Sequence, residues 1–189
     1  MPSHTMELPR QIVVGDKNIG DLGNFLNSLE KTKKISIISG GNVKKIVQKK
    51  IEASLVASKI KGSWYLAKTN DHKTIQEIEK KVRQSKSEIV VGIGGGRSVD
   101  IAKLIGFNLN RPFISIPTSA SHDGIASPFV SVKGDKPHSL VATAPLGVFV
   151  DVDIMKKAPK KLLASGCGDL IAKITAVRDW QLGRDKTGE

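Results

Sequence analysis

One short segment constrains the fold of this chain more than any other: an almost wholly apolar run that leads directly into three glycines. The run is Ile89-Val90-Val91-Gly92-Ile93, and Gly94-Gly95-Gly96 follows it without a break. A half-exposed strand alternates apolar and polar residues, whereas a strand buried on both faces of a parallel sheet is apolar throughout. The segment therefore predicts a central parallel strand that ends in a tight turn before a helix.

Strand-like and helix-like segments alternate along most of the chain. Further apolar runs at residues 11–14, 34–39, 63–67 and 113–116 are separated by segments whose apolar residues recur at helical spacing. Repeated strand, helix, strand units predict an α/β fold, a Rossmann-like, doubly wound, mostly parallel sheet. Close strands around a Gly-Asp turn at residues 134–135 predict a β-hairpin, and residues 147–152 predict a last sheet strand.

The pattern changes near the end of the chain. Beyond Asp153 it becomes helical, with Pro159 near a helix start, and an apolar stripe predicts a last helix from about Gly168; the stripe consists of Leu170, Ile174, Val177 and Leu182. Asp169 would then lie in the first turn of this helix, where a carboxylate can act as a cap. We expect an α/β domain at residues 1–155 and the start of an all-helical second domain at residues 156–189.

Composition limits the classes of partner. The chain has 30 Lys and Arg against 18 Asp and Glu, a net charge of +12, but only 4% aromatic residues. Most of these cations are lysines in pairs spread along the chain, whereas recognition of bases favours Arg and aromatic side chains. We expect a lysine-covered surface that attracts small anionic ligands, and no nucleic-acid partner.

Cysteine content and hydropathy bear on the compartment. Cys167 is the single cysteine, so an internal disulfide is excluded, and we expect it to be a small buried residue. No apolar run approaches the ~20 residues that span a bilayer, and the N-terminus lacks a signal-peptide pattern. These features predict no membrane insertion and a cytoplasmic location.

The glycine-rich turn is the first candidate binding site. The sequence Gly94-Gly95-Gly96-Arg97-Ser98-Val99-Asp100 leads into a helix expected from about Ser98 to Phe107, with Asp100 in its first turn. Glycines allow close backbone approach, so free N–H groups and the positive helix end can hold a pyrophosphate. The turn is neither a GxGxxG fingerprint nor a P-loop, and a tight turn without a ligand is the alternative.

The second candidate is the polar segment that follows the strand at residues 113–116. It reads Pro117-Thr118-Ser119-Ala120-Ser121-His122-Asp123-Gly124-Ile125-Ala126-Ser127-Pro128. It begins at the carboxyl end of a strand, where open α/β sheets bind ligands. The alternative is a turn without a ligand, because Ser, Asp and Gly favour turns.

Together the two motifs resemble those of a known superfamily, that of iron-type alcohol dehydrogenases, glycerol dehydrogenases and dehydroquinate synthases. Residues 94–103 resemble its GGG-x-x-x-D-x-A-K signature, and residues 117–128 resemble the loop of its sn-glycerol-1-phosphate dehydrogenase branch. The resemblance extends from about Leu8 to Gly183. It implies reduction of dihydroxyacetone phosphate by NAD(P)H to sn-glycerol 1-phosphate, a precursor of archaeal-type ether phospholipids, with bound Zn²⁺.

The resemblance also implies roles for individual residues. The cofactor pyrophosphate would contact Gly95, Gly96, Arg97, Ser98, Val99 and Asp100, and the nicotinamide half would contact Thr118, Ser119, Ala120, Ser121 and Ser127. Asp123 and Asp169 would bind substrate, Asp169 would also bind the metal, and His122 is a candidate proton relay. Two further histidine ligands are expected beyond residue 189, so the α/β domain would bind NAD(P) and the helical segment would begin the metal and substrate domain. A homo-oligomer is expected for the complete protein.

The turn after the second predicted strand bears on the choice between NAD(H) and NADP(H). NAD-selective sites place an acidic residue after the second strand, but here that turn reads Ser39-Gly40-Gly41-Asn42. We therefore predict that NADP(H) is accepted alongside NAD(H). Two alternative functions stay open: a dehydrogenase for glycerol or another polyol, and a non-catalytic nucleotide-binding or nucleic-acid-associated fragment.

Overall fold

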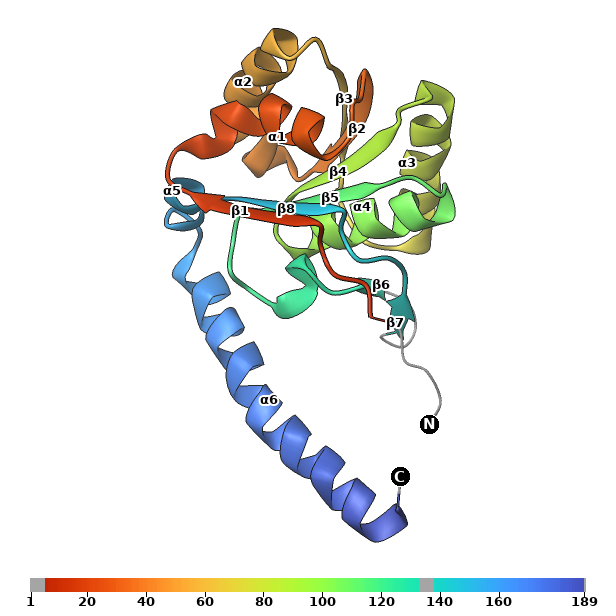
Figure 1. Ribbon diagram of the computed structural model, residues 1–189, viewed down its shortest axis with the longest axis vertical. Coiled ribbons are helices and arrows are strands. Elements are labelled where there is room, and N and C mark those ends of the chain that lie inside the picture. Colours follow the sequence, from red (N-terminus) through yellow and green to blue (C-terminus); the bar gives the residue numbers. More distant parts are fainter. Residues whose placement is uncertain (1–5, 133–137, 189) are drawn as a thin grey trace.

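The computed structural model describes residues 6–132 and 138–188 and contains a six-stranded sheet with helices on both faces (Figure 1). Its strands are β1 (Gln11–Gly15), β2 (Lys34–Ser39), β3 (Lys61–Leu66), β4 (Ile89–Gly94), β5 (Phe113–Pro117) and β8 (Gly147–Asp151). They lie in the order β1-β8-β5-β4-β2-β3, and all neighbouring pairs are parallel. The predicted Rossmann-like, doubly wound α/β fold is confirmed.

Two layers of helices explain the apolar run that forms β4. Val91 belongs to the buried cluster formed with helices α1 (Leu22–Leu29) and α2 (Gly41–Ala57) on one face, and Val90 belongs to the cluster formed with α3 (His72–Ser85) and α4 (Gly96–Asn108) on the other. Every residue of β4 is buried. A central strand that is covered on both faces has no solvent-facing side, so both sets of alternating positions must be apolar or small.

A smaller antiparallel ribbon lies beside this sheet. Strands β6 (Phe129–Val132) and β7 (His138–Val141) pair with each other, as the hairpin prediction requires. The predicted Gly-Asp turn at residues 134–135 lies outside the described residues. A short 3₁₀ turn, Asp123–Ile125, precedes β6 and interrupts the polar segment.

The C-terminal region differs from its prediction. After α5 (Val152–Met155), a single helix α6 runs from Lys160 to Thr187 and away from the sheet (Figure 1). The prediction of a helix starting near Gly168 is therefore wrong, because glycine inside a helix costs only about 1 kcal/mol and does not end it. Asp169 lies in the interior of α6 instead of its first turn, and Cys167 is exposed instead of buried. Among the described helices, none combines the length and apolar character needed to cross a membrane.

Candidate functional site

The site lies where the direction of chain winding reverses. Strands β2 and β4 are neighbours, and the chain leaves β2 toward α2 on one face and β4 toward α4 on the other. The turns after these strands therefore diverge and leave a crevice at the carboxyl edge of the sheet, which is the usual ligand site of open α/β sheets. The two turns are Gly40–Gly41 and Gly94–Gly96.

The glycine-rich turn is held tightly between β4 and α4. Gly94 has a φ of 149°, a conformation that favours glycine, and its carbonyl accepts a hydrogen bond from the N–H of Thr118 (2.9 Å). The helix begins at Gly96, two residues earlier than predicted, so Asp100 lies in its second turn and not its first. A β-carbon at Gly96 would collide with Nε2 of His122. The turn therefore requires glycine at position 94 for its backbone conformation and at position 96 for the close approach of His122.

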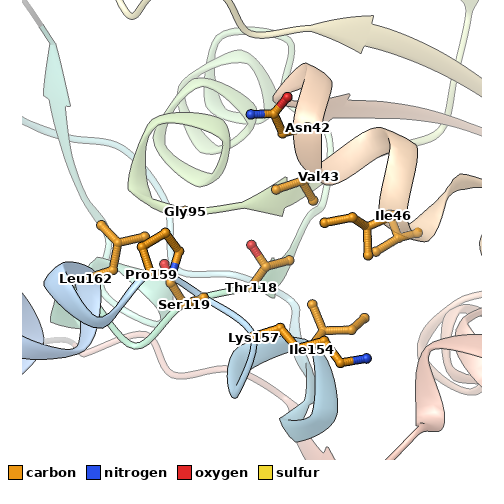
Figure 2. A pocket seen from close by; sticks show the side chains of 12 residues that line it. Asn42, Val43, Ile46, Gly95, Thr118, Ser119, Ile154, Lys157, Pro159 and Leu162 are labelled. Atoms are coloured by element: carbon orange, nitrogen blue, oxygen red, sulfur yellow. The ribbon is translucent and has the colours of Figure 1, made fainter.

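An apolar cavity of about 200 Å³ lies on one side of this turn. Side chains of α2 and of residues 154–162 enclose it from different sides, with Gly95, Thr118 and Ser119 between them (Figure 2). Lys157 is the one charged residue that lines it among the described residues. The cavity therefore suits a flat, mostly apolar group such as an aromatic ring.

A second, polar cavity of about 520 Å³ lies on the other side of the turn. Its lining combines the start of α4, the polar segment and α6, and includes Gly96, Arg97, Asp100, His122, Asp123, Ser127 and Asp169. Nη1 of Arg97 donates a 2.6 Å hydrogen bond to the carbonyl of Lys68. The two cavities together flank Gly95 and Gly96, so an elongated ligand with a central anionic group fits the arrangement.

The two ring nitrogens of His122 differ in their hydrogen bonding. Its Nδ1 accepts a hydrogen bond from the N–H of Gly124 (2.8 Å), whereas Nε2 is buried with no partner among the described residues. An imidazole whose Nδ1 accepts a proton donor carries its own hydrogen on Nε2 when neutral. The nitrogen that could exchange a hydrogen bond with a ligand is therefore Nε2.

Asp123 and Asp169, the two expected substrate ligands, are hydrogen-bonded to each other. The N–H of Asp123 donates to Oδ2 of Asp169 (3.0 Å), and Lys173 donates from Nζ to Oδ2 of Asp123 (2.7 Å). The hydrogen bond from Lys173 lowers the pKa of Asp123, and the nearby charge of Lys173 adds to this effect. Lys173 also lies 3.9 Å from Oδ1 of Asp169. This contact joins α6 to the polar segment.

Lys103 is an ionisable residue with no exposed surface, and neither motif predicted a role for it. Its Nζ donates to the carbonyls of Gly124 (2.8 Å) and Phe129 (2.7 Å) and lies 4.0 Å from Oδ1 of Asp100. Burial lowers the pKa of Lys103, and Asp100 opposes that effect. Burial also raises the pKa of Asp100, while its hydrogen bond from the N–H of Ser131 (3.2 Å) opposes the rise. The signal available in the sequence was the i, i+3 spacing of Asp100 and Lys103 on one helix face.

A metal site requires more ligands than the described residues bring together. Within residues 6–132 and 138–188, no group of three or more His, Cys, Asp or Glu side chains could hold a metal ion. Asp169, the expected ligand, already accepts the N–H of Asp123 and lies near the Lys173 ammonium. A catalytic zinc takes three protein ligands, so these residues do not by themselves fit Zn²⁺.

The expected site residues thus fall into four groups: those that line each of three cavities and those that line none. Gly95, Thr118 and Ser119 line the apolar cavity, and Gly96, Arg97, Asp100, His122, Asp123, Ser127 and Asp169 line the polar one. Ser98 lines a smaller cavity between the turns after β2 and β4, together with Gly40. Val99 is fully buried in the core, Ser121 accepts a hydrogen bond from Ser119, and Ala120 lies against Gly166 of α6. The sequence motifs did not indicate Lys103, Lys173 or the apolar wall formed by α2.

Comparison with known proteins gives a consistent set of similarities. The profile of the family described as iron-containing alcohol dehydrogenase matches residues 13–159. The chain is 65% identical over 189 residues to a protein of Nitrosopumilus maritimus and 61% identical to one of Cenarchaeum symbiosum, both named NAD(P)+ glycerol-1-phosphate dehydrogenase. Each alignment covers 100% of this chain and 53% of the relative, so the chain spans about half the length of these relatives.

Solved structures with low sequence identity share the fold. The glycerol dehydrogenase of Schizosaccharomyces pombe has a TM-score of 0.82 at 23% identity, covering 91% of this chain and 44% of that protein. An NADH-dependent butanol dehydrogenase of Thermotoga maritima also has a TM-score of 0.82, at 19% identity, covering 93% of this chain and 50% of that protein. At this level of identity the likeness concerns architecture, and the function has to be argued from the site.

Proposed function

This chain belongs to the iron-containing alcohol dehydrogenase family, and on that premise we propose that it forms the cofactor-binding part of an NAD(P)H-dependent glycerol-1-phosphate dehydrogenase. The complete enzyme would reduce dihydroxyacetone phosphate to sn-glycerol 1-phosphate, for the synthesis of ether phospholipids. Residues 1–155 would bind the cofactor, and residues 156–189 would begin a helical domain that supplies metal and substrate ligands. The complete protein would be a homo-oligomer.

One observation carries the proposal: two cavities of opposite character meet at the glycine-rich turn. A dinucleotide has an adenine end, a central pyrophosphate and a nicotinamide end. The apolar cavity suits adenine, the free N–H groups at the start of α4 suit the pyrophosphate, and the polar cavity suits nicotinamide with the substrate beside it. In this orientation Thr118 and Ser119 contact the adenine half, unlike the nicotinamide contact that the resemblance implies for them, and Ser127 contacts the nicotinamide half.

The residues of the polar cavity have separate roles in this proposal. Asp123 and Asp169 accept hydrogen bonds from substrate hydroxyl groups, and the nearby cations Arg97 and Lys173 attract its phosphate. His122 presents Nε2–H, because Nδ1 is occupied by the N–H of Gly124. A proton relay through His122 would therefore act at Nε2, the nitrogen that the resemblance leaves unspecified.

Zinc enters the proposal only with ligands from outside the described residues. Asp169 is the one candidate that the resemblance identifies here, and a zinc bound at that position would supply a Lewis acid for the ketone oxygen. Because the described residues do not complete a ligand set, the two further ligands would come from outside the described residues.

Binding and turnover test separate parts of the proposal. We expect the 189-residue chain to bind both NADPH and NADH, measured by nicotinamide fluorescence, because no acidic side chain follows β2 to repel a 2′-phosphate. We expect turnover only in a chimera that joins residues 1–189 to the remaining C-terminal half of the Nitrosopumilus maritimus relative, assayed with dihydroxyacetone phosphate. The matched control is the same chimera with Asp169→Asn, which should bind NADPH but lose turnover.

Three outcomes would contradict this assignment. A chain that binds neither cofactor would refute the cofactor-binding role, and a strong preference for NADH would refute the predicted acceptance of NADP(H). A chimera that oxidises glycerol faster than it reduces dihydroxyacetone phosphate would favour the polyol dehydrogenase alternative.

A further inference from the structure

A buried lysine bridges two ends of the loop that forms one wall of the polar cavity. Lys103 projects from α4 with no exposed surface, and its Nζ donates to the carbonyl oxygens of Gly124 and Phe129, at 2.8 and 2.7 Å. Lysine is almost never fully buried unless it is paired, because removing an ammonium from water is costly. Two short charge-assisted hydrogen bonds and a nearby carboxylate supply that pairing here.

The same turn of α4 fixes the loop at a third point. Oδ2 of Asp100 accepts the N–H of Ser131 (3.2 Å), and Lys103 lies beside the other carboxylate oxygen. The loop is thus attached to α4 at Gly124, Phe129 and Ser131, which bracket Ser127. Within the loop, the N–H of Gly124 donates to Nδ1 of His122 and so links the ring to the same anchor.

We propose that Lys103, with Asp100, is a positioning group that holds residues 122–131 in the shape that meets the nicotinamide end of the cofactor. The inference rests on the proposed function and deepens it, because it divides the glycine-rich motif into two parts. The first part, around Gly95 and Gly96, contacts the cofactor directly. The second part, Asp100 and Lys103, acts through the loop.

The decisive comparison uses two ligands that differ only in nicotinamide. NADPH spans both cavities, whereas 2′-phosphoadenosine diphosphoribose lacks the nicotinamide ring and should engage only the adenine half and the pyrophosphate site. In Lys103→Met the side chain keeps its length but cannot donate, so two carbonyls lose their partner and the loop is released. For the 189-residue chain we expect the Kd of NADPH to rise about tenfold and the Kd of the nicotinamide-free analogue to change less than about twofold.

A second variant and a matched control keep the result interpretable. Asp100→Ala removes the hydrogen bond to Ser131 but leaves Lys103 in place. It should therefore raise the Kd of NADPH more than the Kd of the analogue, but by less than Lys103→Met does. Arg111→Met removes another cation that donates to a carbonyl, that of Val82 (3.0 Å), away from the loop. That control should leave both Kd values unchanged. Hydrogen exchange should speed up at the Gly124 and Ser131 amides in Lys103→Met and not in Arg111→Met.

The outcomes distinguish this inference from the proposed function. If the unmodified chain binds neither ligand, the proposed function fails and the inference fails with it. If the unmodified chain binds NADPH more tightly than the analogue, but the Lys103 and Asp100 variants weaken both ligands equally or neither, the positioning role alone is refuted.

Discussion

Helices α4 and α6 both carry apolar residues at helical spacing, yet they have opposite surroundings. In α4, residues such as Val99, Ile101 and Ile105 are buried against the sheet. In α6, which the structure describes along its whole length, no residue is buried, and Ile174 and Trp180 are 58% and 66% exposed. An apolar stripe therefore indicates that a helix requires a partner, without showing that the partner lies within the same 189 residues.

The contact between α6 and the rest of the chain is polar and local. It involves Gly166 against the backbone of Ala120, together with the bonds among Asp123, Asp169 and Lys173. The α/β region has a core formed by both faces of the sheet, whereas α6 is positioned by a few surface contacts. We expect the two regions to respond differently to mutation.

The largest expected difference concerns side-chain truncation. Leu26 of α1 is fully buried, so Leu26→Ala should lower the free energy of unfolding by about 2–5 kcal/mol. Ile174→Ala on α6 should change it by less than about 0.5 kcal/mol, because that side chain is largely in water. Urea unfolding of both variants, followed by far-UV circular dichroism at two protein concentrations, measures the contrast. Equal losses would show that α6 is covered, for instance by self-association.

The regular part of the fold was predictable because its signals are local. The strands at residues 34–39 and 113–116 and the predicted central strand were placed to within a residue or two from short apolar runs. Asp71 accepts the N–H of Thr74, three residues further along the chain, and caps α3. In each case neighbouring residues determine the structure, so the pattern is visible in the sequence.

The site was predictable only in part, because its walls come from distant segments. The motifs singled out Gly96 and Asp123, and the structure places both in the lining of one cavity. They did not indicate that Val43 of α2 and Ile154 of α5 would close the other cavity. Lys103 was missed because a lysine is expected in water, and only the fold shows that backbone carbonyls replace that water. Asp169 was misplaced because glycines alone do not end a helix.

Two glycines of α6 that lie two residues apart should respond in opposite ways to substitution by alanine. The expected changes in stability are smaller than that of Leu26→Ala. A β-carbon at Gly166 would collide with the carbonyl oxygen of Ala120, whereas one at Gly168 meets nothing within 4 Å. Gly168→Ala should stabilise α6 by up to about 1 kcal/mol through helix propensity. Gly166→Ala brings the same gain but forces α6 from the loop, at a cost of about 1–3 kcal/mol.

Limited proteolysis within α6, together with urea unfolding, measures this pair. We expect faster cleavage of α6 in Gly166→Ala and slower cleavage in Gly168→Ala, relative to the unmodified chain. Equal behaviour of the two variants would mean that α6 does not rest on the Ala120 carbonyl.

The smallest expected effect concerns pH, and it tests whether α6 is attached by charge. The bond from Lys173 lowers the pKa of Asp123, so its contribution is present above the unfolded pKa of about 3.9 and is lost as pH falls through the lower folded value. The same bond raises the pKa of Lys173, so that contribution is present below about 10.4 and is lost as pH rises through the higher folded value. Hydrogen exchange in α6, corrected for intrinsic rates, should therefore be slowest between about pH 4 and 10.

Because both side chains are more than half exposed, added salt should weaken the contact between Lys173 and Asp123. Lys173→Met should abolish the pH dependence of hydrogen exchange in α6. A pH dependence that survives in Lys173→Met would show that another group holds α6 against the polar segment.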